Sequence, residues 1–388
     1  MTEPTSTGAL AGLRVIDFSR FMPGAYFGWI AGDTGAEVIR IENPREIAKS
    51  QGHDVEAFVR RRAMQSWQRG RRSLLLNPGH AAAREVLLKL IGEADVLVED
   101  YRRGVMEKMG LGYAEMAKLN PRLIYCSVTL AGQDGPLAAR AGHDPIALSL
   151  SGALSRLNGQ PVPTLPGVQL ADVLAGAHAA LGIFTALQAR ERTGRGQHVD
   201  AAMSDACMPL VAITMARNED LSALPPPDGK WHPKGGVWLC GDGGYICTTD
   251  MEPRYWARFC DVMGRPDFAA IQNDASRHAE MRGALEAIFL TRPRDEWAAL
   301  FADADTQAMP VYSVGEAADH PHNRARGAVV DLPHGDETLR HVGTPFRLSD
   351  TPPVPGAVHG VPGADSDAIL AELGFDAATL RASGAMEA

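Results

Sequence analysis

The stretch LRVIDFSRFMPGAYFGWIAGDTGAEVIRIE, residues 13–42, decides the fold class of this chain. Its first six residues, 13–18, are an apolar run typical of a buried strand. Pro23 and Gly24 begin a helical pattern that continues to Asp33, and a second strand pattern occupies residues 37–42. A strand, a helix and a second strand in this order predict a βαβ unit, the building block of parallel sheets.

Three further apolar runs, at residues 73–76, 95–99 and 123–128, extend this pattern. We therefore expect an α/β protein whose large domain is a doubly wound, Rossmann-like parallel sheet. The first strand pattern is followed by SRFMPG (19–24) and not by a GxGxxG motif, which argues against a nicotinamide enzyme. Walker A, HExxH and GxSxG motifs are also missing from the sequence, which argues against the ATPases, zinc proteases and hydrolases that carry them.

The second half of the chain predicts a smaller α+β domain. A long Ala-rich helix at 173–192 is followed by the Pro-rich segment LPPPDG, and then by a hairpin pattern at 238–249. From about Leu332 the chain is rich in Pro and Gly and is expected to be irregular until a short helix at 367–373. The predicted parts are a large domain at 1–215, completed by 340–388, a linker at 216–232, a small α+β domain at 233–315 and a return linker at 316–339.

Composition limits the partners and the location of the protein. The sequence has 38 Lys and Arg residues against 47 Asp and Glu residues, and the net charge of −9 argues against nucleic acid or an anionic membrane as the main partner. Five scattered cysteines without CxxC spacing indicate neither a disulfide framework nor a metal site. The N-terminus lacks a signal-peptide pattern, and the apolar stretch at 173–189 is too short to span a bilayer. We therefore expect a cytoplasmic protein that binds no metal.

One basic cluster stands out in this acidic chain. Six of the thirteen residues from 60 to 72 are arginines, with Trp67 among them. Arginine suits bidentate contacts to phosphate and stacking on a flat base, so a pocket for a phosphorylated, adenine-bearing ligand is one interpretation. A solvated basic loop or a set of ion pairs between subunits is an equally good interpretation from sequence alone.

Four other residues are candidates for acid–base chemistry. His143 and Asp144 precede a helical run, Asp172 stands at the head of the apolar helix, and Glu252 follows the hairpin. Each of the three carboxylates also fits the role of a helix N-cap. His143 taken alone fits a buried structural histidine as well as a catalytic one.

Segments spread over most of the chain resemble the class III CoA-transferase family (CaiB/BaiF), which also contains the α-methylacyl-CoA racemases. The matching segments occur in the order typical of the family. They are LAGLRVIDFSRFMPG (10–24), GAEVIRIENP (35–44), RRSLLLN (71–77), ADVLVEDYRRGVMEKMGLGY (94–113), NPRLIYCSVTLAGQDGP (120–136), GHDPIALSLSGAL (142–154), ADVLAGAHAALGIFTALQARERTGRGQHVDAAMSDA (171–206) and HPHNRARG (320–327).

The resemblance implies catalytic roles for the candidate residues. Asp172 matches the active-centre aspartate, which in the transferases attacks the donor thioester and then carries the acyl group and CoA. In the racemases the same aspartate is one of two acid–base groups, and the histidine of a GHD motif, here His143, is the other. Asp144 and Glu252 match residues that support this imidazole.

The motifs are divided between the two branches of the family. The GHD motif and MEPRYWARFC (251–260) are similar to the racemases, whereas GVQLADVLAG (167–176) and GTPFRLSDTP (343–352) are similar to the transferases. A racemase needs one base and one acid on opposite faces of the α-carbon, which accounts for both His143 and Asp172. We therefore predict a racemase or epimerase of acyl-CoA thioesters. The alternatives are a transferase that moves CoA to a free carboxylic acid through Asp172, and a catalytically idle CoA-binding homologue.

The resemblance further implies that CoA, as part of the substrate and not as a tightly bound cofactor, lies across the large domain. It also implies an interlocked homodimer with the active site between the large domain of one subunit and the small domain of the other. Seven residues match positions that contact CoA in the family: Arg20, Phe21, Asn43, Arg71, Asp100, Tyr101 and Lys108.

Overall fold

The computed structural model describes residues 8–157, 163–216, 221 and 235–387. The chain forms two compact units, of which the larger combines Met1–Pro225 with Arg324–Ala388 and the smaller is Pro226–Asn323. The sequence analysis predicted a large domain completed from residue 340, and the larger unit resumes at Arg324.

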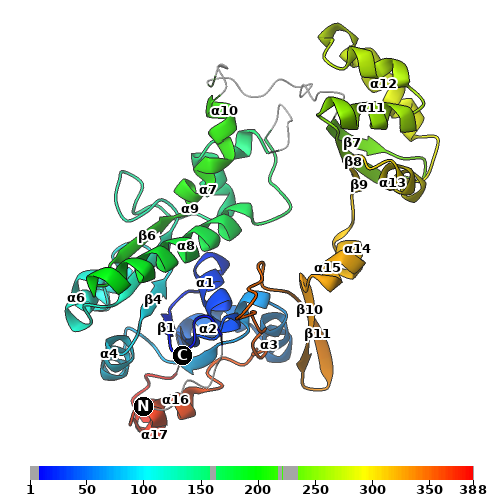
Figure 1. The fold of residues 1–388 in the computed structure, drawn as a ribbon. Helices are drawn as coiled ribbons and strands as arrows, with labels where there is room; N and C mark the ends of the chain where they lie inside the picture. Colours follow the sequence, from blue (N-terminus) through cyan, green and yellow to red (C-terminus); the bar gives the residue numbers. More distant parts are fainter. Residues whose placement is uncertain (1–7, 158–162, 217–220, 222–234, 388) are drawn as a thin grey trace. The chain divides into compact units, whose positions relative to one another are not determined.

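A six-stranded parallel sheet forms the centre of the larger unit, with the strand order β3-β2-β1-β4-β5-β6 (Figure 1). This order is that of the doubly wound nucleotide-binding folds, so the predicted fold class is confirmed. The strands are β1 (Arg14–Asp17), β2 (Glu37–Glu42), β3 (Arg72–Leu75), β4 (Val96–Glu99), β5 (Ile124–Thr129) and β6 (His198–Ala202).

Helices cover both faces of this sheet. Neighbouring residues of β1, Val15 and Ile16, belong to two different apolar clusters, because successive side chains of a strand point to opposite faces. Both faces of a parallel sheet are therefore buried, as its connections require. The helices of this part are α1 (Met22–Asp33), α2 (Pro44–Gln51), α3 (Val55–Ala63), α4 (Arg84–Gly92), α5 (Val105–Lys108), α6 (Tyr113–Leu119), α7 (Asp144–Leu150), α8 (Leu170–Thr193), α9 (Met203–Cys207) and α10 (Ala212–Ala216).

The longest helix, α8, packs closely on α1. A Cβ atom at Gly176 would lie 2.4 Å from the side chain of Tyr26, so only glycine permits this approach. By length and composition α8 could cross a membrane. Its face bearing Ala171, Ala175 and Ala179 is buried in the apolar cluster shared with α1 and the sheet, as expected for a core helix.

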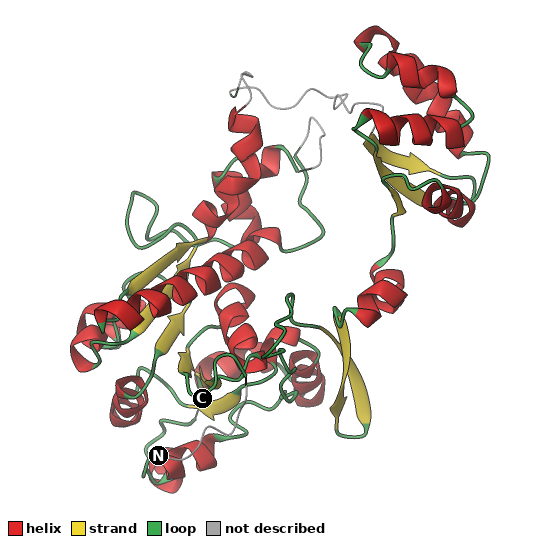
Figure 2. Cartoon of the chain, in the orientation of Figure 1, coloured by secondary structure: helices red, strands yellow, loops and turns green. Residues whose placement is uncertain are grey.

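The smaller unit is built from a three-stranded antiparallel sheet and helices, distinguished as yellow and red in Figure 2. Its core is aromatic: the rings of Phe259 and Phe301 stack with centroids 5.5 Å apart, and Trp238 stacks on Phe289 at 5.2 Å. The predicted hairpin and α+β character are confirmed. The elements are β7 (Gly235–Leu239), β8 (Tyr245–Thr249), β9 (Ala308–Pro310), α11 (Pro253–Val262), α12 (His278–Phe289), α13 (Arg294–Asp303) and α14 (Val314–Asp319).

The segment predicted to be a return linker and then irregular contains regular structure. After α15 (Pro321–Ala325), strands β10 (Val329–His334) and β11 (Glu337–Val342) form an antiparallel hairpin. Gly335 adopts a φ of 58° at the first position of its two-residue turn, which favours glycine. Backbone groups of Val342 bind Ser66 and Arg69, so the hairpin belongs to the larger unit. Helices α16 (Ser366–Glu372) and α17 (Ala377–Ala382) complete this unit.

Candidate active site

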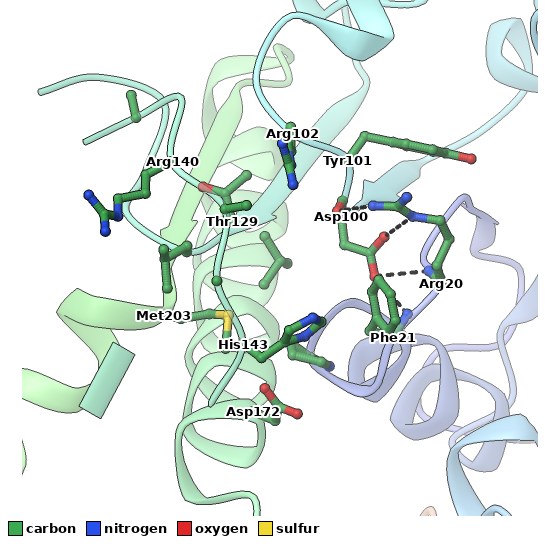
Figure 3. A pocket seen from close by; sticks show the side chains of 16 residues that line it. Arg20, Phe21, Asp100, Tyr101, Arg102, Thr129, Arg140, His143, Asp172 and Met203 are labelled. Atoms are coloured by element: carbon green, nitrogen blue, oxygen red, sulfur yellow. Dashed lines mark hydrogen bonds and ion pairs between the residues drawn. The ribbon is translucent and has the colours of Figure 1, made fainter. Parts of the chain in front are cut away.

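A cavity of about 480 Å³ lies at the carboxyl ends of β1, β4 and β5 (Figure 3). Strand order reverses between β1 and β4, and doubly wound sheets bind their ligands outside the carboxyl ends of the strands at such a point. Its volume is suited to a small-molecule ligand. The lining residues are Arg20, Phe21, Pro23, Asp100, Tyr101, Arg102, Val128, Thr129, Leu130, Ala138, Arg140, Ala141, Gly142, His143, Asp172 and Met203.

Two loops that follow β1 and β4 are held together by the Asp100 carboxylate. Its Oδ2 accepts hydrogen bonds from the backbone N–H groups of Arg20 (2.9 Å) and Phe21 (2.8 Å). The Arg20 guanidinium binds Oδ1 at 3.2 Å and lies 4.2 Å from the ring centroid of Tyr101. Four of the seven predicted CoA-contacting residues therefore form one wall of the cavity.

Asp172 lies in the first turn of α8 and points into the cavity. Its backbone N–H donates a 3.0 Å hydrogen bond to the buried Oδ2 of Asp144, which ties the start of α8 to the start of α7. Partial burial is the main cause that raises the pKa of Asp172 from 3.8 to about 6. The nearby Asp144 carboxylate adds to this rise, whereas His143 lowers the pKa.

His143 precedes α7 and lines the same cavity as Asp172, and the two side chains lie next to each other in Figure 3. Its imidazole is exposed and packs edge-on against Phe21, with centroids 5.7 Å apart. The structure thus brings together the predicted pair of acid–base groups from segments 29 residues apart in the sequence. Asp144 is a buried hydrogen-bond acceptor for the backbone of α8.

Three of the predicted CoA contacts lie outside the lining of the cavity. Asn43 is the N-cap of α2 and accepts a hydrogen bond from the backbone N–H of Arg45. Lys108 is exposed on α5. Arg71 is buried, and it binds Asp17 at 2.6 Å and the carbonyl oxygen of Ala25.

The buried part of the basic cluster at 60–72 forms ion pairs within the chain, whereas the sequence analysis considered a phosphate pocket, a solvated loop or ion pairs between subunits. Arg69 has no exposed surface and binds both carboxylate oxygens of Asp33, at 3.1 and 2.6 Å. Arg69 and Arg71 are therefore buried cations that are paired with carboxylates inside the fold. Glu252 lies in the smaller unit, exposed, at the N-cap position of α11.

The sequence analysis missed Arg102, Thr129, Arg140 and Met203 as residues of the site. Arg102 directly follows the predicted pair Asp100 and Tyr101, so its position after the end of β4 could have identified it as a site residue from the sequence. Arg140 belongs to the connection between β5 and α7, whose course the sequence does not reveal. Among the described residues, we find no cluster of three or more His, Cys, Asp or Glu side chains arranged to hold a metal ion.

The fold and the cavity define an α/β protein with an acidic side chain in a cavity at the switch point of a doubly wound sheet. A family model, CoA-transferase family III, matches residues 10–366. The chain therefore belongs to CoA-transferase family III, as the resemblance of its segments predicted.

Relatives with different activities support this assignment. The succinyl-CoA:mesaconate CoA-transferase of Haloarcula marismortui is 32% identical and the match covers 96% of this chain and 98% of that protein. The alpha-methylacyl-CoA racemase of Homo sapiens is also 32% identical, over 95% of this chain and 94% of that protein. A solved CAIB/BAIF family protein from Brucella suis has a TM-score of 0.78 at 28% identity and covers 94% of this chain and 99% of that chain.

Proposed function

We propose that the protein inverts the configuration at the α-carbon of an acyl-CoA thioester. The observation that carries this proposal is the presence in one cavity of His143, which precedes α7, and Asp172, in the first turn of α8. An α-proton next to a thioester is weakly acidic, so its removal needs a positioned base and its return to the other face needs a positioned acid.

The proton transfers balance when the pair carries one proton in total. Neutral His143 takes the α-proton from one face, and the electron pair of the C–H bond moves into the thioester carbonyl to give an enolate. Protonated Asp172 then donates its proton to the opposite face, and the carbonyl re-forms. The products are protonated His143 and ionised Asp172, the pair required for the reverse direction.

The environment of Asp172 suits this role. A carboxylic acid with a pKa of about 6 is protonated in about a tenth of molecules at neutral pH, against about one in a thousand at an unperturbed pKa. The two groups interact, so a pH–rate profile reports apparent pKa values of the pair. We expect a bell-shaped profile for kcat/KM.

For the substrate, we propose that CoA enters at the wall formed by the β1 and β4 loops. Arg102 and Arg140 are exposed cations at the cavity, and their guanidinium groups suit the phosphates of CoA. Arg20 and Tyr101 offer a stacked cation–ring surface beside them.

A second candidate function is CoA transfer to a free carboxylic acid. It is favoured by the partial exposure of Asp172, which a nucleophile requires, and by the relatives that are CoA-transferases. In that reaction the Asp172 carboxylate attacks the donor thioester and expels CoA thiolate, which gives an acyl anhydride on Asp172. His143 then has no essential acid–base step.

The experiment that separates these functions uses a chiral α-methylacyl-CoA in deuterated water. We expect wild type to invert the substrate and to incorporate deuterium at the α-carbon, and His143→Ala and Asp172→Ala each to lower inversion by about 100- to 10,000-fold. His178→Ala, at an exposed histidine of α8, is the matched control and keeps wild-type activity.

A parallel assay supplies an acyl-CoA donor, a free carboxylic acid and hydroxylamine. Donor-dependent hydroxamate at Asp172 without exchange of the α-proton would overturn the racemase proposal and support the transferase. In that case His143→Ala retains most of the transfer activity.

We also propose an interlocked homodimer, as the resemblance to the family implies. Subunits that thread through each other separate only after unfolding, so two differently tagged preparations should form no hybrids under native conditions. Rapid hybrid formation on mixing would reject this architecture.

A further inference from the structure

Thr129, the last residue of β5, has a buried hydroxyl without a partner at the wall of the cavity. Only 9% of the residue is exposed, and Oγ1 finds no hydrogen-bond partner within the described part of the chain. Buried hydroxyls are almost always hydrogen-bonded, so an unsatisfied one at a ligand cavity calls for a physical explanation.

The local fold explains why no protein group satisfies this hydroxyl. Thr129 pairs in the sheet with Ala202 of β6, whose methyl side chain offers neither donor nor acceptor. Its chain neighbours Val128 and Leu130 also belong to the lining of the cavity, and their side chains are buried in an apolar cluster. Neither its sheet partner nor its two chain neighbours therefore offers a polar side chain to the Thr129 hydroxyl.

Other threonines of the chain show the usual arrangement. The hydroxyl of Thr34 donates to the carbonyl oxygen of Ile30 at 2.7 Å, and the hydroxyl of Thr248 accepts from the indole N–H of Trp238 at 2.8 Å. A strand position needs only a β-branched side chain, and valine fills it equally well. The described contacts therefore show no stabilising role for the Thr129 hydroxyl in the folded chain.

We propose that Thr129 is a substrate-binding residue whose hydroxyl hydrogen-bonds an amide of the pantetheine arm of the acyl-CoA. Rotation about χ1 to another staggered rotamer moves Oγ1 to the place of the methyl group or of the Cβ hydrogen, and in the proposed contact Oγ1 turns toward the ligand. This proposal rests on the proposed function only in taking an acyl-CoA as the ligand.

The position of Thr129 favours the arm over the reacting thioester. His143 and Asp172 must flank the α-carbon for the proposed proton transfers, and His143 lies between Thr129 and Asp172 in Figure 3. Thr129 is the last residue of β5, whereas His143 precedes α7 and Asp172 lies in the first turn of α8, so Thr129 is the one of the three at a strand end. The part of the ligand that joins the thioester to the nucleotide passes this section of the wall, and its amides both donate and accept hydrogen bonds.

Thr129→Val tests the proposal because valine keeps the shape of the side chain and removes the hydroxyl. We expect the dissociation constants of CoA and of acetyl-CoA, measured by calorimetry, to rise about three- to tenfold, as for the loss of one neutral hydrogen bond. The affinity for adenosine bisphosphate, the nucleotide part without the arm, should not change. Thr129→Ser keeps the hydroxyl and should bind CoA within about twofold of wild type.

Stability provides an independent readout of the same variant. Thr129→Val removes an unsatisfied buried group, so its unfolding midpoint should equal or exceed that of wild type. The matched control is Thr248→Val, which leaves the buried indole N–H of Trp238 without its acceptor. It should lower the unfolding midpoint and leave CoA affinity unchanged.

Several results would overturn the inference. If Thr129→Val binds CoA with wild-type affinity, the hydroxyl makes no hydrogen bond to the ligand. If the variant loses as much affinity for adenosine bisphosphate as for CoA, the substitution damages the whole site. A loss confined to acetyl-CoA assigns the hydroxyl to the thioester and overturns the contact with the arm. Failure of wild type to bind CoA at all would instead reject the acyl-CoA ligand of the proposed function.

Discussion

Two sets of arginines in the larger unit show opposite uses of the same side chain. Arg69 and Arg71 are buried and bind the carboxylates of Asp33 and Asp17. Arg102 and Arg140 are exposed at the cavity, and neither side chain has an ion pair with any of the described residues. The first set is neutralised within the fold, whereas the second remains available to an anionic ligand. Density of arginine in the sequence is therefore a poorer guide to a phosphate site than the presence of unpaired charge.

Arg71→Met offers the largest test of this contrast. It leaves Asp17 buried without its counter-charge, and breaking a buried pair costs about 3–5 kcal/mol of unfolding free energy. Urea denaturation measures this loss, with Arg277→Ala, at an exposed pair with Glu280, as a control that should leave the unfolding midpoint unchanged. If Arg71→Met has wild-type stability and binds CoA tenfold more weakly, Arg71 contacts the ligand, and the buried ion pair is not its main role.

The opposite result is expected at the cavity. Arg102→Ala and Arg140→Ala should each raise the dissociation constant of CoA about tenfold, or about 1.4 kcal/mol, and leave stability within about 0.5 kcal/mol. The effect should shrink as salt is added, because these cations are exposed. Arg103→Ala, at a neighbouring exposed arginine outside the cavity lining, is the matched control. If it weakens binding as much, the two cavity arginines have no special role.

Asp172→Asn tests the unpaired charge of the site through stability. The pKa of Asp172 is raised from 3.8 to about 6, so ionisation disfavours the folded state, and the stability present below about pH 4 is lost as the pH rises through 6. Asparagine does not ionise. Because Asp172 is only partly buried, we expect the variant to be more stable than wild type by about 1 kcal/mol at pH 8. Denaturation at two pH values measures this difference, which should vanish near pH 4, and a pH-independent difference would contradict the raised pKa.

The smallest effect is expected at the exposed end of the basic cluster. Arg60 binds Glu337 at 3.0 Å with both side chains about half exposed. Arg60→Ala should change the unfolding free energy by about 0.5 kcal/mol or less, and the CoA dissociation constant by less than about twofold. A tenfold loss of CoA affinity would extend the ligand site into the cluster at 60–72.

The sequence predicted the elements that depend on local pattern. Strand β2 matches its predicted range, and the residues after β1 and β4 meet because the carboxyl ends of neighbouring parallel strands share one edge of the sheet. The partner of Arg71 was not predictable in this way, since Asp17 lies 54 residues away on another strand. Whether an arginine is neutralised depends on such distant pairings, which periodicity does not encode.

The β10–β11 hairpin was missed for a different reason. Pro333 interrupts the strand pattern, and proline is tolerated in strands mainly at sheet edges, where no ladder hydrogen bond is lost. A two-stranded ribbon consists of edges only, so it accepts a proline opposite Thr338. Thr129 was missed because a strand-ending threonine has no distinctive signature until its environment is known.

The outer edge of β3 has a consequence for the synthesis of the protein on the ribosome. Ser73 and Leu75 turn their backbone groups outward to Asp365 and Ser366, the N-cap and the first residue of α16 near the end of the chain. At about 5–20 residues per second, the 292 residues that separate Ser73 from Asp365 take roughly 15 to 60 s to emerge. During this time the nascent sheet has an open edge, a template for aggregation. Ribosome-bound chains that end before Asp365 should therefore bind chaperones at β3, and full-length chains should not.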